Sequence, residues 1–204
     1  MKYLIGAGGH ASVICDIAKK QSIKIDGVFV DNGAKNITNL PIVDEIANVS
    51  NYRNDEFLIA FGNVPARMKL EKHLSDKVAF FTLIDQSAII CENVKIGAGT
   101  VIMPGVIINS GAIIGNHAII NSGSIVEHGC IVANHVHMSP KSVLCGNTIV
   151  GEGTWIGTGT TVIDDITIGR NCTIGAGSLV IRNIPDNSLS YGVPSKIIKR
   201  YSNK

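Results

Sequence analysis

The chain has 204 residues, enough for one or two domains with a sizeable core. Charged residues make up only 17% of it and the formal net charge is +2, so it lacks the basic stripe that nucleic-acid binding requires. No charged-then-apolar signal segment precedes Tyr3, and no apolar run approaches the roughly 20 residues of a membrane span. Five cysteines without CxxC spacing indicate neither a disulfide framework nor a thiolate zinc site. We expect a cytoplasmic, soluble protein that binds neither nucleic acid nor membranes.

The first part of the chain alternates short apolar runs with helical patterns of apolar residues. Strand, helix and strand in that order favour parallel pairing, so residues 1–83 are predicted to form a small Rossmann-like α/β domain. In chain order, the predicted elements are a strand at 3–5, a glycine turn at 6–10, a helix at 11–20, strands at 27–30 and 57–61, a turn at 62–63 and a helix at 64–74.

The first turn, Gly6-Ala7-Gly8-Gly9-His10, connects a predicted strand to a predicted helix. Backbone N–H groups at such a helix start favour phosphate, and Asp31 stands at the end of the second strand. A dinucleotide fingerprint is a weaker interpretation, because the region is too short for two mononucleotide-binding halves. The turn therefore indicates a phosphate site.

From Ile84 to Val180, seventeen aliphatic residues follow one another at intervals of six, without insertion or deletion. The fifth residue of the hexad is small or β-branched in many repeats, and the fourth is glycine in eight hexads and asparagine in four, the residues that tolerate positive φ. Such hexads are typical of a parallel β-helix. With three hexads per coil, residues eighteen apart should lie directly above one another. Cys130 and Cys172 fall in the fifth position and are predicted core residues.

With the glycine turn in front of it, the hexad pattern resembles the bacterial sugar O- and N-acyltransferases of the sialic acid O-acetyltransferase type. Within them it looks closest to the N-acetyltransferases of UDP-4-amino-4,6-dideoxy sugars. The resemblance implies a left-handed β-helix over residues 84–204, acetyl-CoA as co-substrate, and a homotrimer with active sites between adjacent β-helices. A trimer also suits the physics, because a β-helix has exposed faces to cover.

His128 occupies the third position of its hexad, on a turn where a side chain can point outward. A solvated turn histidine is the ordinary interpretation. The resemblance places the catalytic general base here, in an EH segment matched by Glu127 and His128, and an ordinary histidine pKa near 6.5 suits that task. The family usually has an acidic residue next, which orients the imidazole, whereas this chain has Gly129. Orientation must then come from elsewhere, such as Glu127 or a neighbouring subunit.

Three further residues complete the predicted reaction centre. His137 follows His128 by nine residues, half a coil, so the two can meet only across a subunit interface. The resemblance implies that His137 contacts the acetyl donor, and the alternative interpretation is an ordinary outward-facing strand residue. Gly146, eighteen residues after His128, should stack next to it, and its N–H is a candidate oxyanion donor, although a plain turn glycine is simpler. Asn121, at the start of this histidine-rich segment, is predicted to bind the acceptor sugar.

His117 and His135 are also eighteen residues apart and should stack on one edge. Such a pair invites comparison with the γ-class carbonic anhydrases, which bind zinc through histidines on this same fold. No third ligand stands in register and that class lacks the N-terminal region seen here, so we expect no metal site.

The resemblance also assigns the remaining binding residues. It puts Gly8, Gly9 and His10 around the nucleotide phosphates, Asp31 and Asn32 near the base, and Gly62 in the pocket wall; a strand-end turn and a loop residue are simpler interpretations of Gly62 and Asn32. Thr158 and the YGVPSK segment, with Ser195 and Lys196, are assigned to coenzyme A. The predicted activity is acetyl transfer from acetyl-CoA to the 4-amino group of a UDP-linked deoxyamino sugar. The alternatives are O-acetylation of a sialic acid or related sugar, and a non-catalytic nucleotide-sugar-binding trimer.

Overall fold

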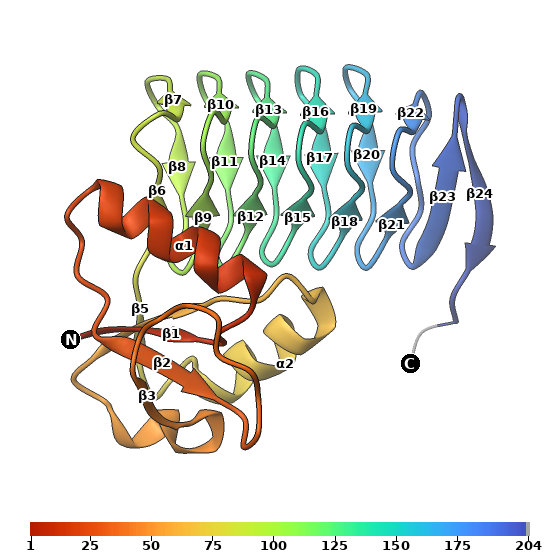
Figure 1. Cartoon of the computed structure of the whole chain (residues 1–204). Helices are drawn as coiled ribbons and strands as arrows, with labels where there is room; N and C mark the ends of the chain where they lie inside the picture. Colours follow the sequence, from red (N-terminus) through yellow and green to blue (C-terminus); the bar gives the residue numbers. More distant parts are fainter. Residues whose placement is uncertain (203–204) are drawn as a thin grey trace.

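The computed structural model describes residues 1–202 and shows an α/β domain beside a β-helix (Figure 1). The domain is built on a five-stranded, all-parallel sheet in the order β3-β2-β1-β4-β5. Its elements are β1 (Lys2–Ile5), α1 (Gly9–Lys20), β2 (Gly27–Val30), β3 (Ile42–Glu45), the 3-10 helix η1 (Ile46–Asn51), β4 (Glu56–Ile59), α2 (Val64–Leu74) and β5 (Ala79–Phe80). The predicted β-α-β order and parallel pairing are confirmed, while β3, η1 and β5 were not predicted.

Both faces of this sheet are buried, as expected of parallel strands. Leu4 and Leu58 pack with α1 on one face, in a core that also contains Val101 of the β-helix. Tyr3 and Phe57 point to the other face, where they pack with residues of η1 and α2. The α2 helix begins where the sequence predicts it, because the Asn63 side chain accepts a hydrogen bond from the Ala66 N–H at 2.9 Å.

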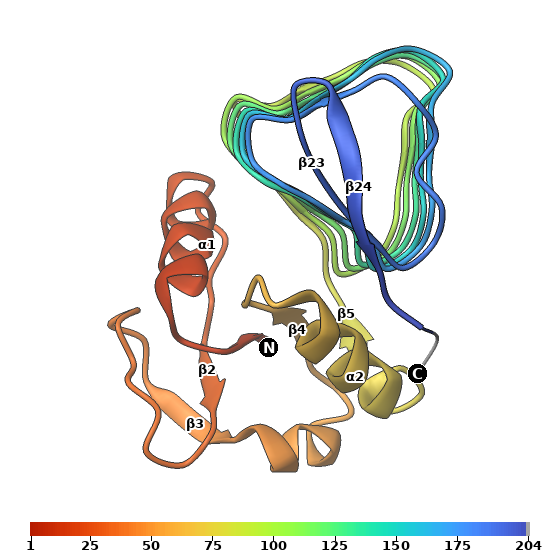
Figure 2. The ribbon, with the colours of Figure 1, turned by 90° about the vertical axis from the view of Figure 1, so that its right-hand side faces the viewer.

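The hexad rule holds through the second region, which is a left-handed β-helix of parallel two-residue strands closed at its end by the longer, antiparallel pair β23 (Ser188–Gly192) and β24 (Ser195–Arg200). Partners are eighteen residues apart, as in the pairing of Ile119 with His137. Figure 2 looks along the β-helix and shows its triangular section, with the α/β domain at one side. The first sheet contains β6 (Leu83–Ile84), β9 (Val101–Ile102), β12 (Ile119–Ile120), β15 (His137–Met138), β18 (Trp155–Ile156), β21 (Thr173–Ile174), β23 and β24. The second contains β7 (Ile89–Ile90), β10 (Ile107–Ile108), β13 (Ile125–Val126), β16 (Val143–Leu144), β19 (Thr161–Val162) and β22 (Leu179–Val180); the third contains β8 (Lys95–Ile96), β11 (Ile113–Ile114), β14 (Ile131–Val132), β17 (Ile149–Val150) and β20 (Thr167–Ile168).

The hexad positions explain how each turn is made. From Asn93 to Gly177, every fourth-position residue has a positive φ, including the non-glycine residues His117 and His135. Aliphatic first positions fill the core, and polar fifth positions reach a carbonyl inside it, as Thr100 does by donating to the Gly115 carbonyl at 2.7 Å. Each buried hydroxyl is thereby satisfied, which removes the cost of placing it in the core.

The α/β domain packs on the first part of the first sheet. The outward residues Leu83, Val101 and Ile119 are each 1% exposed, whereas Trp155, further along the same sheet, is 47% exposed. Arg67 of α2, itself 1% exposed, donates to the carbonyls of His117 at 3.0 Å and His135 at 2.8 Å. One buried cation therefore fastens the domain to the coils, and burial lowers its pKa to about 10.

Within residues 1–202, no helix is long and apolar enough to cross a membrane.

Candidate active site

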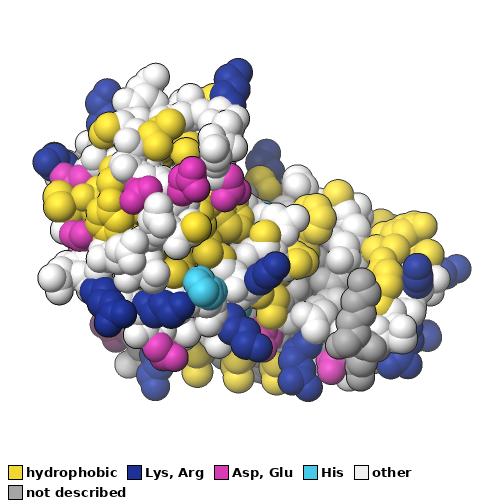
Figure 3. Space-filling view, turned by 90° about the horizontal axis from the view of Figure 1, so that it is seen from below, with side chains coloured by type: hydrophobic (Ala, Val, Ile, Leu, Met, Phe, Trp, Pro, Cys, Tyr) yellow, Lys and Arg dark blue, Asp and Glu magenta, His cyan; other side chains and the backbone are white. Residues whose placement is uncertain are grey.

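A first cavity of about 690 Å³ lies at the carboxyl edge of the parallel sheet, where the strand order reverses between β1 and β4. Such a switch point is the usual ligand site of an open α/β sheet. Gly8 and Asp31 line the cavity, and Lys35 and Lys69 add two positive charges. Figure 3 views the molecule from the side of this domain, where a row of lysine and arginine side chains follows one margin.

The helix start beside this cavity has the backbone that phosphate binding requires. Gly8 is the N-cap of α1 and makes no side-chain cap, so the first N–H groups of the helix lack a capping acceptor. Asn32 and Gly9 are exposed but do not line the cavity. His10 lies near His137 and Arg67, and its Nε2 is buried without a hydrogen-bond partner. Of the three residues predicted around the phosphates, only Gly8 therefore lines the first cavity.

A second cavity, of about 610 Å³, lies between the α/β domain and the first sheet of the β-helix. Gly62, His137 and Trp155 line it. The His137 Nδ1 lies 3.2 Å from the Gly62 carbonyl, and its Nε2 lies 3.4 Å from the Asn121 Nδ2. A carbonyl accepts only, so Nδ1 carries the proton and Nε2 accepts from the amide. Gly62, which was predicted in the nucleotide pocket, in fact lines this second cavity.

His137, which lines the second cavity, and the nearby His10 are neutral near pH 7. Burial lowers the pKa of His137 to about 4, although the hydrogen bond to Gly62 opposes this. Burial also lowers the pKa of His10 to about 4, and the proximity of His137 and Arg67 lowers it further. Neutral imidazoles suit polar contacts to an uncharged part of a ligand.

His128 lies on a different part of the β-helix, on the turn between the second and third sheets. Its side chain is exposed, and the imidazole covers Gly146 of the next coil, as the spacing predicts. A Cβ at position 146 would lie 2.6 Å from the His128 Cε1 and 2.8 Å from its Nε2. The N–H of Gly146, the candidate oxyanion donor, already donates to the Asp164 Oδ1 at 3.0 Å. Gly146 therefore provides space for the imidazole, and its N–H is engaged.

Gly129 occupies a tight turn position. Its φ is +67°, a left-handed conformation that favours glycine, and a Cβ there would lie 2.4 Å from the Asn147 Oδ1, the tip of an exposed side chain. The Asn147 Nδ2 in turn donates to the Asp165 Oδ1 at 3.1 Å. A side chain at position 129 would have to displace Asn147, so glycine suits the packing of this column.

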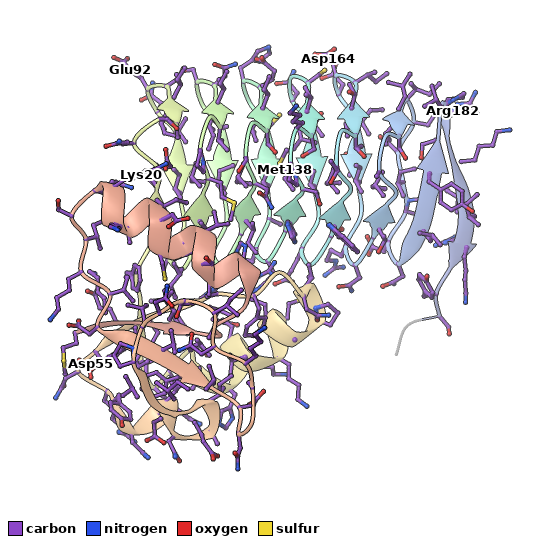
Figure 4. The ribbon with its side chains drawn as sticks, viewed as in Figure 1. Lys20, Asp55, Glu92, Met138, Asp164 and Arg182 are labelled. Atoms are coloured by element: carbon purple, nitrogen blue, oxygen red, sulfur yellow. The ribbon has the colours of Figure 1, made fainter. Side chains whose placement is uncertain are left out.

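Within one chain, the His128 turn and the second cavity face different directions. Figure 4 labels Asp164, of the His128 column, at the edge of the β-helix that lies away from the α/β domain. His137 is on the first sheet, whose outer side carries that domain. A site that uses both histidines requires two chains, as their half-coil separation predicts.

His117 and His135 stack as predicted, with ring centroids 5.2 Å apart and an interplanar angle of 8°. Both are buried at the joint between the domains, where the Phe80 ring meets His117 edge-on at 4.6 Å. Burial lowers both pKa values to about 4, so the 3.5 Å contact of His135 with Glu71 is not an ion pair at neutral pH. Among residues 1–202 there is no cluster of three or more potential metal ligands. The pair packs the domain joint.

The predicted coenzyme A residues lie beyond these cavities. Thr158 and Lys196 are exposed and Ser195 is half-buried, with its hydroxyl 2.7 Å from the Ser190 hydroxyl. None of the three lines a cavity described here. A third cavity, of about 950 Å³, adjoins the second at Met68 and extends to Lys199 and Arg200, the last two residues of β24.

Sequence reasoning missed several residues of these sites. Lys35, Lys69 and Trp155 line cavities but stand in stretches without a recognisable motif. Asp164 was detectable in principle, because it follows His128 by two coils in the same hexad position.

Two family models match the chain. The PglD N-terminal domain matches residues 3–74, and the bacterial transferase hexapeptide (six repeats) matches residues 87–122 and 147–182. Among curated proteins, the chain is 31% identical over 101 residues to an uncharacterized protein of Acanthamoeba polyphaga mimivirus. That match covers 49% of this chain and 20% of the viral protein, so the chain spans about a fifth of the length of this curated relative.

Solved structures match nearly the whole chain. PerB from Caulobacter crescentus, in complex with CoA and GDP-perosamine, is 33% identical with a TM-score of 0.91, and the match covers 97% of both chains. The acetyltransferase domain of PglB from Neisseria gonorrhoeae, in complex with acetyl coenzyme A, is 27% identical with a TM-score of 0.89, and the match covers 97% of this chain and 98% of that one. The protein is therefore an enzyme of the acetyltransferase class and belongs to the hexapeptide-repeat family of sugar acyltransferases.

Proposed function

We propose that this protein transfers the acetyl group of acetyl-CoA to the 4-amino group of a UDP-linked amino-deoxy sugar. One observation carries the coarser activity, N-acetylation of an amino sugar: the chain matches PerB, described with CoA and GDP-perosamine, over 97% of its length. Related structures are named as perosamine N-acetyltransferase with one histidine replaced. The choice of UDP, and the residue roles below, are the finer parts of the proposal.

The first cavity is the proposed site of the nucleotide diphosphate. The helix start at Gly8 offers N–H groups to phosphate, and Lys35 and Lys69 balance its charge. Asp31 is placed to accept from a ribose hydroxyl or the base, with Asn32 next to it. His10 and Gly62 then lie on the side that leads to the sugar, toward His137 and Asn121.

The acetyl donor is proposed to run along the outer side of the first sheet. The second and third cavities adjoin there through Met68, and Lys199 and Arg200 at the far end suit the phosphates of coenzyme A. His137 would contact the thioester end. Thr158, Ser195 and Lys196 remain proposed donor contacts, and the exposure of Thr158 and Lys196 leaves them accessible to a second chain or to the donor.

A homotrimer is the proposed assembly. The third sheet presents Ile113, Ile131 and Ile149 outward in one column, and each is 40% exposed. Aligned exposed isoleucines on a flat sheet favour burial against another chain. Packing the His128 turn against the first sheet of a neighbour would join the two halves of the site, which one chain keeps apart.

The chemistry needs one base and no covalent enzyme intermediate. The neutral sugar amine attacks the thioester carbon, and His128 accepts the amine proton as the C–N bond forms. The tetrahedral intermediate then releases the CoA thiolate, which takes the proton from the imidazolium. Gly146 contributes the open space in which the imidazole stands; its N–H could serve an oxyanion only after Asp164 releases it. Both co-substrates are charged nucleotides that do not cross membranes unaided, so we place the reaction in the cytoplasm.

The test is a thiol-release assay with acetyl-CoA and a panel of UDP- and GDP-linked amino and hydroxy sugars, followed by mass spectrometry. We expect CoA release and an amide product with a UDP-4-amino sugar, and loss of turnover in His128→Ala. Turnover of only GDP-linked acceptors would refute the choice of UDP, and an ester product would favour O-acetylation. Binding without any turnover would indicate the non-catalytic alternative.

A further inference from the structure

Three residues in one hexad position form a column beside the proposed base. His128, Gly146 and Asp164 occupy the third hexad position at the same vertex of three consecutive coils, each eighteen residues after the last. Because coils stack at this interval, the central glycine leaves a gap between a histidine on one side and a carboxylate on the other. The column therefore brings together two groups that are 36 residues apart in the chain.

The imidazole and the carboxylate enter the same gap. The point where a Gly146 Cβ would stand is 2.8 Å from the His128 Nε2 and 3.2 Å from the Asp164 Oδ1. The two atoms are thus no more than about 6 Å apart, because each is about 3 Å from that point. The Gly146 N–H donates to the same Oδ1 at 3.0 Å and fixes where the carboxylate stands.

The other candidates for orienting His128 are less well placed. Position 129 holds glycine and so offers no carboxylate, and the Asn147 side chain fills the space beside it. The Glu127 carboxylate bends back to the backbone N–H of His128, with its Oε2 at 3.4 Å. Asp165 is held by Asn147 in the next column.

Most of the charged residues near the His128 turn are acidic. Glu127 and Asp165 lie on this vertex with Asp164, Glu92 lies two coils away on the opposite side, and Arg182 follows Asp164 by one coil in the same column. The Cys145 thiol lies in the same turn region; its pKa is raised by burial first, then by Asp164 and Glu127.

We propose that Asp164 is a positioning residue for His128, whose carboxylate reaches across Gly146 to hold the imidazole and stabilise its protonated form. It takes the part of the acidic residue that is missing at position 129. The inference rests on the proposed function, in which His128 is the base. The Cε1–Nε2 edge of the ring faces Asp164, which leaves Nδ1 for the acceptor amine.

The test compares Asp164→Asn with two matched controls, Glu127→Gln and Asp165→Asn. Asparagine keeps an oxygen for the Gly146 N–H and removes only the charge, and Asp164→Ser serves if that variant folds poorly. We expect kcat to fall by roughly tenfold to a hundredfold in Asp164→Asn with little change in the KM for acetyl-CoA, and the acid limb of the pH–rate profile to move to lower pH by up to about one unit. The controls should stay within about twofold of the parent.

An activity-free measurement separates this inference from the proposed function. NMR titration of the histidine Cε1 protons, with the His128 signal identified through His128→Gln, should show a lower pKa for His128 in Asp164→Asn and no change in the controls. An unchanged His128 titration in Asp164→Asn, or an equal shift in Glu127→Gln, would overturn the inference whatever the enzyme acetylates. If no acceptor is turned over, the proposed function fails while the titration still decides the role of Asp164.

Discussion

Gly146→Ala is expected to remove most of the activity while leaving the fold intact. The new Cβ would lie 2.6 Å from the His128 Cε1 and 2.8 Å from its Nε2, closer than carbon atoms approach without a shift. The nearest atoms belong to the tip of an exposed side chain, so the imidazole swings away and the backbone stays in place. The φ of Gly146 lies outside the left-handed region, and Ser110 occupies the same hexad position two coils earlier.

The two effects of this substitution differ in size. A positioned general base contributes about 10² to 10⁴ in rate, so displacing His128 should lower kcat by at least roughly a hundredfold. Replacing glycine by alanine where the backbone allows it changes the free energy of unfolding by only about 1 kcal/mol or less. Activity and stability should therefore separate clearly.

The assay measures CoA release with the acceptor that the wild-type enzyme uses, together with the thermal unfolding midpoint. Ser110→Ala is the matched control. It changes the same column one coil before His128 without entering the space of the imidazole, and it should retain near-normal kcat. A Gly146→Ala enzyme with normal kcat and normal stability would refute the assignment of His128 as the base.

Three other perturbations test the joint between the domains and the assembly. Arg67→Ala removes the donor to two buried carbonyls and should lower the free energy of unfolding by about 3 to 5 kcal/mol in chemical denaturation; a loss below about 1 kcal/mol would contradict its anchoring role. Ile131→Lys should shift a trimer toward monomers in sedimentation experiments, since it places a charge in the proposed interface; an unchanged trimer would exclude this sheet. The folded pKa values of His117 and His135, about 4, lie below the unfolded value of 6.5, so stability should be complete above pH 6.5 and fall toward pH 4 by up to roughly 1.4 kcal/mol per pH unit for each histidine. A thermal midpoint that is flat from pH 7 to pH 4.5 would contradict this.

The repeat could be predicted because its register is periodic and uninterrupted. Counting by eighteen placed Gly146 next to His128 and stacked His117 on His135, and both placements hold in the structure. The same interval also leads to Asp164, two coils from His128, which no motif of adjacent residues marks.

The parts that could not be predicted depend on contacts between distant segments. The β3 strand is an edge strand whose residues are exposed or half-buried, so it lacks the apolar alternation that marks a strand. Arg67 lies in a helix with several charged residues, so its sequence context indicates a solvent-exposed side chain. In the structure it is buried against the β-helix. The direction of His10, toward His137 and away from the first cavity, likewise arises only when the domain docks.

The central claim is that His128 of one chain works with His137 of another. Complementation tests it directly: His128→Ala and His137→Ala are prepared separately, mixed in equal amounts under conditions that exchange subunits, and assayed for kcat/KM with limiting acetyl-CoA. Each variant alone should be strongly impaired. Random mixing leaves about a quarter of the sites with both histidines if they come from different chains, so the mixture should recover about a quarter of the wild-type activity. A mixture no more active than the average of the two variants would show that each site uses the histidines of a single chain, and would contradict the account.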